Sequence, residues 1–285
     1  MSNLNISQAQ RLDQKVVELL PRLSRAFAAK LIEQGSVTVN HEVVTKPGQK
    51  LKESDVVKVD YDMSELDKIP DIDLPILYED EDCIVLNKPV GVLTHSKGAF
   101  NPEATVATFL RTRINGMAGE RAGIVHRLDR ATSGVIICAK NPAALSWLQK
   151  QFSQRKTKKT YIAIVEGAMS QNHAVIDMPI ERNPKRPQTF RVGANGKPAV
   201  TEYSVTENNG TLSLLELKPT TGRTHQLRVH LSNLGHPILG DQLYGGREAD
   251  RLYLHALSLE ITLPSRERKV FTAPLPKDFK KVMQS

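Results

Sequence analysis

Cysteine, long apolar runs and nucleotide-binding glycine motifs are scarce or missing in this chain of 285 residues. Its two cysteines, Cys83 and Cys138, each lie in an apolar run, which favours buried free thiols over a disulfide. The chain has no paired-cysteine motif, no His-Glu-x-x-His and no phosphate-binding glycine loop, so neither a metal nor any other cofactor is predicted. No apolar run approaches the roughly 20 residues that cross a bilayer, and the first ten residues lack a signal-peptide core. We therefore expect a cytoplasmic monomer without membrane contact.

The charge of the chain is unevenly distributed. The net charge is +8, with +2 on residues 1–60, −8 on residues 61–82 and +14 on residues 83–285. A strongly basic body beside a separate acidic segment indicates a polyanionic partner, most simply a nucleic acid. On charge alone, a basic surface that only maintains solubility is the alternative.

The first part of the chain, residues 11–60, has the pattern of a small α/β domain with two helices, a hairpin and a strand. Its markers are an apolar helical face (Leu12, Val16, Leu19, Leu20, Leu23), an interruption at Pro21, a helix cap at Ser24, a helix end at Gly35, a turn at Asn40-His41 and a strand over residues 55–59.

The helix pair, followed by Gly-x-Val-x-Val-Asn and a later Gly-x-x-Leu-x-x-x-Asp, resembles the small RNA-binding module first known from ribosomal protein S-four. The resemblance implies that the basic face of the two helices lies on structured RNA, with Arg25 and Lys30 among its contacts. An unrelated α/β appendage is the alternative.

Residues 61–75 are polar and acidic and contain Pro70 and Pro75, which predicts a linker. Residues 76–285 form the second predicted domain. Its expected strands lie at residues 83–86, 135–139, 161–165, 199–206, 212–217 and 252–261, and its expected helices at residues 105–113 and 142–154. Because strands and helices do not alternate regularly, we predict an α+β domain with a mixed, largely antiparallel sheet and flanking helices.

Residues 126–134 read His-Arg-Leu-Asp-Arg-Ala-Thr-Ser-Gly and lead directly into an apolar strand. Asp129 is the only acid among the four ionisable groups of this run. A carboxylate at the mouth of a buried strand, flanked by guanidinium groups, is expected to stay ionised and suits a nucleophile or an electrostatic catalyst. Taken alone, an aspartate beside an arginine is more often a structural ion pair.

Two further segments belong with this motif. The basic residues 155–159 run into a strand that opens with Tyr161, where cations suit phosphates and an aromatic ring can stack on a base. Thr224 is predicted to cap a helix ending at Gly235, on which Arg228 can point toward a buried carboxylate. A half-buried strand tyrosine and a solvated helix arginine are the alternatives. We interpret residues 235–241 as scaffold.

Together these segments resemble the RluA-type family of RNA pseudouridine synthases. The family signature stands complete at residues 126–134, and its Gly-Arg-x-His-Gln-Leu-Arg-x-His motif at residues 222–230. An Asn-Lys-Pro-x-Gly turn at residues 87–91 and the Lys-x-Tyr at residues 159–161 also match. The resemblance implies an isomerase, an intramolecular transferase that cuts the glycosidic bond of a uridine, rotates the uracil and rejoins its carbon 5 to the sugar without a cofactor.

The resemblance also implies roles for individual residues. Asp129 is the essential carboxylate, Arg228 keeps it charged, and Tyr161 stacks on the uracil. Leu227 forms an apolar wall, and Arg127 fills the gap that the flipped uridine leaves in the RNA. His126, beside Arg127, joins the RNA-binding set.

Two other functions compete with this interpretation. One is a non-catalytic RNA-binding or ribosome assembly factor with the same fold. The other is a glycosidase-like hydrolase, which needs two carboxylates around the bond, and here Asp241 is the only weak candidate beside Asp129. The appended module and the basic body favour large-subunit ribosomal RNA over transfer RNA as the partner.

Overall fold

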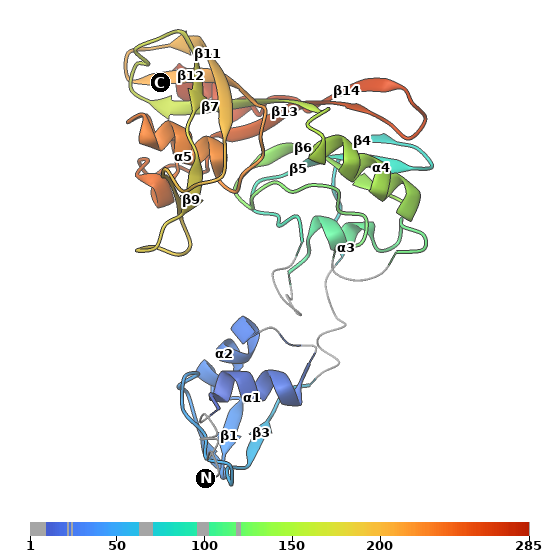
Figure 1. Ribbon diagram of the computed structural model, residues 1–285, viewed down its shortest axis with the longest axis vertical. Helices are drawn as coiled ribbons and strands as arrows, with labels where there is room; N and C mark the ends of the chain where they lie inside the picture. Colours follow the sequence, from blue (N-terminus) through green and yellow to red (C-terminus); the bar gives the residue numbers. More distant parts are fainter. Residues whose placement is uncertain are drawn as a thin grey trace, which may run out of the picture. The chain divides into compact units, whose positions relative to one another are not determined.

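The computed structural model divides into two compact units (Figure 1). One consists of Met1–Ile72 with His95–Thr108, and the other of Asp73–Thr94 with Phe109–Ser285. The residues that the structure describes are 10–21, 23, 25–62, 71–95, 103–117 and 121–284. Within these ranges, no helix is both long and apolar enough to cross a membrane.

The smaller unit pairs two helices with a three-stranded antiparallel sheet of order β2-β1-β3. Its elements are α1 (Leu12–Leu19), α2 (Arg25–Glu33), β1 (Val37–Val39), β2 (Glu42–Val43) and β3 (Val57–Val59). The predicted turn is confirmed, because Asn40 and His41 both have positive φ, as a two-residue hairpin loop requires. Leu19 is 45% exposed, so its placement on the buried helix face was wrong. The predicted cap Ser24 lies outside the described residues.

The larger unit is built on one sheet of order β4-β5-β6-β13-β7-β12-β11-β8, with β14 paired to β13. Within the described ranges, the only parallel pair of this sheet is β6 with β13. The predicted mixed, largely antiparallel sheet is therefore confirmed. Its strands are β4 (Ile76–Glu79), β5 (Cys83–Lys88), β6 (Ser133–Ala139), β7 (Lys158–Glu166), β8 (His173–Asp177), β11 (Val200–Asn208), β12 (Leu212–Pro219), β13 (Leu254–Thr262) and β14 (Arg268–Thr272).

Helices and a separate hairpin flank this sheet. They are α4 (Pro142–Ser153), α5 (Gln226–Asn233), the 3-10 helix η2 (Gln242–Tyr244), α6 (Lys277–Met283) and the hairpin of β9 (Ile180–Arg182) with β10 (Phe190–Val192). The short helix α3 (Val106–Leu110) spans the division of the chain between the two units. Asn141 caps α4 by accepting the Ala144 N–H, and Pro142 takes the first helical position, where its missing N–H costs nothing.

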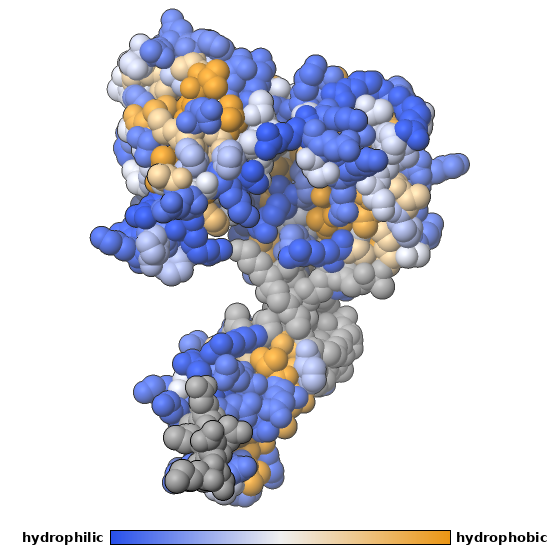
Figure 2. Space-filling model, in the orientation of Figure 1, coloured by the Kyte–Doolittle hydropathy of each residue, from blue (hydrophilic) through white to orange (hydrophobic). Residues whose placement is uncertain are grey.

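The sheet carries two apolar clusters that fix its flanking helices. In one, Ala144 and Leu148 of α4 pack against β5, β6 and β13, and in the other, Leu227 and Leu231 of α5 pack against β7 and β12. Figure 2 shows mostly hydrophilic side chains on the visible face of this unit, with a hollow between the side that carries α4 and the side that carries α5. The segments predicted to carry chemistry come from the elements around the middle of this sheet.

Candidate active site

Asp129 sits on a loop that the neighbouring turn holds in place from several sides. The hydroxyl of Thr94 donates to the Leu128 carbonyl (2.8 Å) and accepts the Leu128 N–H (3.2 Å). Gly91 N–H donates to the Arg130 carbonyl at 2.9 Å. The residues on both sides of Asp129 are thus tied to the turn after β5, which leaves its side chain as the part that faces the pocket.

Lys88, at the end of β5, lies beneath this loop with no exposed surface. Its Nζ donates to the carbonyls of Pro89 (2.9 Å), Val92 (2.8 Å) and Arg130 (3.3 Å). Burial lowers the pKa of Lys88 to about 7, although the nearby Asp129 carboxylate acts in the opposite direction. The buried lysine therefore connects the turn after β5 to the Asp129 loop through these hydrogen bonds.

The glycine that closes the signature has a packing reason. Gly134 has φ +112°, and a Cβ there would lie 2.1 Å from the Ala256 carbonyl oxygen of β13. Only glycine permits this approach of β6 to its parallel neighbour, because any side chain would force the two backbones apart. The approach fixes where β6 begins and hence where the preceding Asp129 loop lies.

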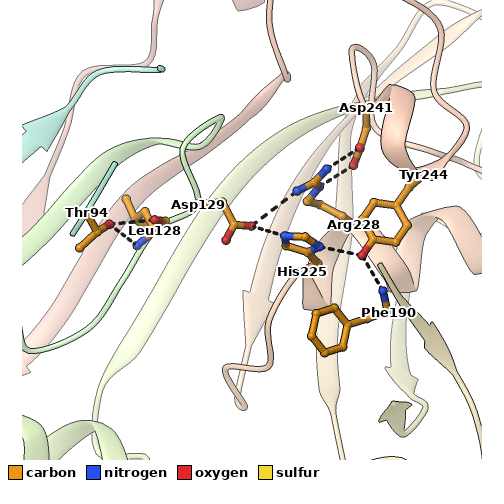
Figure 3. A network of polar contacts seen from close by, with 8 residues as sticks. All are labelled: Thr94, Leu128, Asp129, Phe190, His225, Arg228, Asp241 and Tyr244. Atoms are coloured by element: carbon orange, nitrogen blue, oxygen red, sulfur yellow. Dashed lines mark hydrogen bonds and ion pairs between the residues drawn. The ribbon is translucent and has the colours of Figure 1, made fainter. Parts of the chain in front are cut away.

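Arg228 lies between two carboxylates (Figure 3). It makes a bidentate pair with Asp241, Nε to Oδ2 and Nη2 to Oδ1, both at 2.7 Å, whereas Nη1 lies 3.7 Å from Oδ2 of Asp129. Arg228 is 8% exposed and Asp241 is 2% exposed. The prediction that Arg228 points to the buried side is confirmed, but its strongest partner is Asp241. Asp241 belongs to residues 235–241, which we interpreted as scaffold, and it holds the Arg228 side chain in place.

The helix that carries Arg228 begins differently from the prediction. α5 starts at Gln226, after His225 in the left-handed region (φ 56°), and Thr224 does not cap it. Instead, the Gln226 side chain accepts the Arg223 N–H at 3.0 Å and the Thr221 hydroxyl at 2.7 Å. A carboxamide inside the first turn thus binds the backbone amide that precedes the helix. The helix ends at Asn233, and Gly235 (φ 83°) follows as the expected terminating glycine.

Asp129, Tyr161, Leu227 and Arg228 all line one pocket of about 130 Å³, with Arg127 also on its wall. Tyr161 is half-buried, and burial, with a smaller contribution from Asp129, raises the pKa of its phenol. A larger groove of about 590 Å³ adjoins this pocket and shares Arg127, Lys159 and Tyr161 with it. The structure thus brings the three predicted catalytic residues together.

The other predicted residues lie in different settings. Arg127 is exposed, whereas His126 stacks on Phe152 and its Nε2 accepts the Ile137 N–H at 3.1 Å. Burial lowers the pKa of His126 to about 3, so the imidazole is neutral near pH 7 and brings no charge to RNA. In the smaller unit, Lys30 is exposed, and Arg25 is exposed and pairs with Asp13 at 2.9 Å.

Four residues near Asp129 were missed as site residues. Lys88 was noted only as part of the turn at residues 87–91, and Asp241 only as a weak second acid. His225, within the second motif, lies 3.7 Å from Asp129, and Tyr244 hydrogen-bonds to it at 2.7 Å. The only sequence signal for Asp241 and Tyr244 was a charged or polar residue beside a glycine-rich turn. Such turns are common, so the signal was too unspecific to identify them as site residues.

The comparison with family models follows the same division of the chain. Residues 82–233, more than half of the chain, match the model described as RNA pseudouridylate synthase, and residues 10–57 match the S4 domain. The chain therefore belongs to the RNA pseudouridylate synthase family. It is an isomerase that converts uridine to pseudouridine, as predicted, and it carries an S4 domain at the N-terminal end of this sequence.

Known proteins are similar to this chain over most of their own length. An "Uncharacterized RNA pseudouridine synthase" of Aquifex aeolicus is 41% identical over 84% of this chain and 78% of its own. The "Ribosomal large subunit pseudouridine synthase D" of Pasteurella multocida is 36% identical over 100% of this chain and 94% of its own. Among solved structures, "Human RNA Pseudouridylate Synthase Domain Containing 1" has 30% identity and a TM-score of 0.60 over 74% of this chain and 94% of its own.

Proposed function

We propose that this enzyme isomerises specific uridines of large-subunit ribosomal RNA, as a monomer in the cytoplasm, where ribosomes are made. The observation that carries the chemistry is the Asp129 carboxylate, which shares one pocket with Tyr161 and Arg228. The ribosomal substrate is supported by relatives named for the large subunit, which match the chain along its whole length.

The reaction breaks the bond from uracil N1 to the anomeric carbon and forms one from C5 to the same carbon. C5 loses a proton and N1 gains one, so the isomerisation is redox-neutral. Asp129 must be anionic and close to the sugar, whether it adds to the anomeric carbon or removes a sugar proton. Because Asp241 holds two nitrogens of Arg228, the third nitrogen presents a fixed cation to Asp129.

Tyr161 and Leu227 shape the place of the detached uracil. An apolar cavity of roughly 150 Å³ holds benzene, so the pocket of about 130 Å³ has the scale of a single six-membered ring. The Tyr161 ring would stack on the uracil and Leu227 would close an apolar side. Arg127, exposed beside the pocket, is placed to enter the stack that the flipped uridine leaves.

The groove beside the pocket suits the RNA strand that leads to the target. Arg127, Arg155, Lys159 and Arg223 line it, and no carboxylate is among its described lining residues. Lys159 Nζ donates to the Thr221 carbonyl at 3.0 Å, and burial lowers its pKa to about 8. A bound phosphate would offset the effect of burial on Lys159 and favour its charged form, so the groove is suited to an anionic ligand.

We further propose the domain limits 11–60 for RNA binding, 61–75 for the linker and 76–285 for catalysis. In the first domain, Arg25 and Lys30 would contact RNA together with Arg11, the exposed residue that precedes α1. His126 would contribute to RNA binding only indirectly, by holding the backbone that carries Arg127, because its own Nε2 is already bound to Ile137.

The test is a map of pseudouridines in all cellular RNA from a strain that lacks the gene, complemented with the wild type or with Asp129→Asn. Loss of discrete large-subunit sites, restored only by the wild type, is expected. If the map is unchanged and only subunit assembly suffers, the protein is an assembly factor in the cell. If the missing sites lie in transfer RNA, the ribosomal substrate is wrong.

A further inference from the structure

His225 stands at the entrance of α5 in a backbone conformation that a residue with a side chain seldom adopts. Its φ is 56°, and its imidazole makes no capping bond to the helix. A non-glycine residue in this region costs of the order of 1–3 kcal/mol, and such positions persist where surrounding contacts hold them. Here those contacts lie on the two ring nitrogens, one toward Asp129 and one toward Tyr244.

The hydrogen bonds around Tyr244 indicate which imidazole nitrogen carries the proton. The phenol oxygen accepts the Phe190 N–H at 3.0 Å, and a backbone amide can only donate. Burial raises the pKa of Tyr244, so the phenol keeps its own hydrogen. Nδ1 of His225, 2.7 Å away, is placed to accept that hydrogen. In the neutral imidazole the proton then resides on Nε2, the nitrogen that faces Asp129.

Two donors converge on the same oxygen of the carboxylate, as Figure 3 shows. Nε2 of His225 and Nη1 of Arg228 both lie 3.7 Å from Oδ2 of Asp129. These distances are long for hydrogen bonds, and they tighten if the carboxylate moves by less than 1 Å toward the pair. With both contacts on Oδ2, the other oxygen, Oδ1, is turned to the substrate.

We propose that His225 and Tyr244 are positioning residues of this synthase: the Tyr244 hydroxyl holds His225 as the Nε2–H tautomer, and that N–H aligns Asp129 together with Arg228. The inference rests on the proposed role of Asp129. It also links the β9–β10 hairpin to the carboxylate, because the Phe190 N–H orients the phenol from that hairpin. The Tyr244 ring has a second contact, since the Arg228 guanidinium lies 4.9 Å from its centroid.

The test is a double-mutant cycle of Tyr244→Phe and His225→Ala, with Tyr203→Phe as control. Phe keeps the ring beside Arg228 and removes only the hydroxyl, whereas Tyr203 is a buried phenol on β11 that does not line the pocket. Single-turnover rates and the Kd for RNA are measured on one substrate. We expect Tyr244→Phe to slow turnover about tenfold, or ~1.4 kcal/mol of transition-state stabilisation, with Kd changed less than twofold. The control is expected within twofold of wild type.

The cycle separates positioning from packing. In the His225→Ala background, Tyr244→Phe should slow turnover by less than twofold, because the hydroxyl acts through the imidazole. His225→Gln, which can still offer an N–H near the Nε2 position, should recover part of the rate lost in His225→Ala. Multiplicative losses, or a full rate in Tyr244→Phe, would overturn the proposal.

A second measurement needs no substrate. Nitrogen-15 NMR of histidine-labelled protein distinguishes the tautomers, and His225 is assigned as the signal missing in His225→Gln. We expect the Nε2–H form in the wild type and a mixture in Tyr244→Phe, and an Nδ1–H form in the wild type contradicts the inference. A failure of the proposed function can be told apart from a failure of this inference. In that case Asp129→Asn would turn over RNA at the wild-type rate, whichever tautomer His225 adopts.

Discussion

Replacing Asp241 with asparagine tests whether the buried ion pair between Asp241 and Arg228 holds the Arg228 guanidinium in place beside Asp129. At an effective dielectric constant of about 20, Coulomb attraction is about 6 kcal/mol at the 2.7 Å separation from Asp241 and about 4.5 kcal/mol at the 3.7 Å separation from Asp129. Asp241 adds two short hydrogen bonds, so it decides where the guanidinium lies. Asp241→Asn keeps the side-chain shape and removes the charge.

Two results are expected of Asp241→Asn. Breaking a buried pair by removing one partner costs 3–5 kcal/mol, and because Asn keeps one acceptor we expect a loss of about 3 kcal/mol in the free energy of unfolding. The freed guanidinium would then close on Asp129 with two nitrogens and cover Oδ1 as well as Oδ2, so that neither carboxylate oxygen faces the sugar. Single-turnover rates should therefore fall at least tenfold. Urea unfolding and single-turnover assays on the same preparations measure the two effects.

The matched control is Glu260→Gln, which removes a carboxylate paired with Lys158 and Arg268 at the surface. Surface pairs contribute about 0–1 kcal/mol, so this variant should unfold almost as the wild type does. Adding Asp129→Asn should destabilise the Asp241→Asn background more than the wild type, because Asp129 would by then be the remaining anion for Arg228. Equal stability of Asp241→Asn and Glu260→Gln would refute the reasoning.

Four other outcomes follow from the site. Asp129→Asn should abolish isomerisation with RNA affinity nearly intact, and residual single-turnover activity within about tenfold of wild type, ~1.4 kcal/mol, would contradict its role. Tyr161→Phe should be tolerated far better than Tyr161→Ala, because stacking on a base is worth roughly 1–3 kcal/mol; equal damage in rate assays would point to the hydroxyl instead. Deleting residues 1–60 should weaken RNA binding across a salt series more than it slows chemistry on saturating RNA, and unchanged affinity would rule out an RNA-binding role. Lys88 has a pKa of about 7 in the folded state and 10.5 in the unfolded chain, so the unfolded state binds more protons between these two pH values. The free energy of unfolding should therefore rise with pH in this range. Urea unfolding from pH 7 to 10 should show a shallower rise for Lys88→Met than for the wild type, and equal slopes would contradict the lowered pKa.

Local patterns predicted the elements whose cause is local. The hairpin turn at Asn40-His41 and the start of α4 at Pro142 depend on neighbours in the sequence, and both stand where they were expected. The strands β8, β9, β10 and β14 and the helix α6 were not predicted, because each is a short run with few buried residues and therefore carries little apolar pattern.

The site residues likewise fall into those that the sequence predicted and those that it did not. Asp129, Tyr161 and Arg228 stand inside long motifs, and the structure places all three on one pocket. Asp241 and Tyr244 reach the site through a turn and a 3-10 helix that come after α5, so no periodicity relates them to Arg228. The error at Thr224 has a similar cause, because the side chain that binds the backbone before the helix belongs to Gln226, inside the helix.

The place of β13 in the sheet bears on the order in which the enzyme can be made. Without β13 the sheet separates into β4-β5-β6 on one side and β7-β12-β11-β8 on the other. The Asp129 loop leads into β6 of the first part, whereas Tyr161 lies on β7 of the second. During synthesis, the ribosome must therefore deliver residues 254–262 before the carboxylate and the aromatic platform can share one sheet. Until then the nascent chain holds two half-sheets with open edges, the state most exposed to misassembly and most in need of a chaperone.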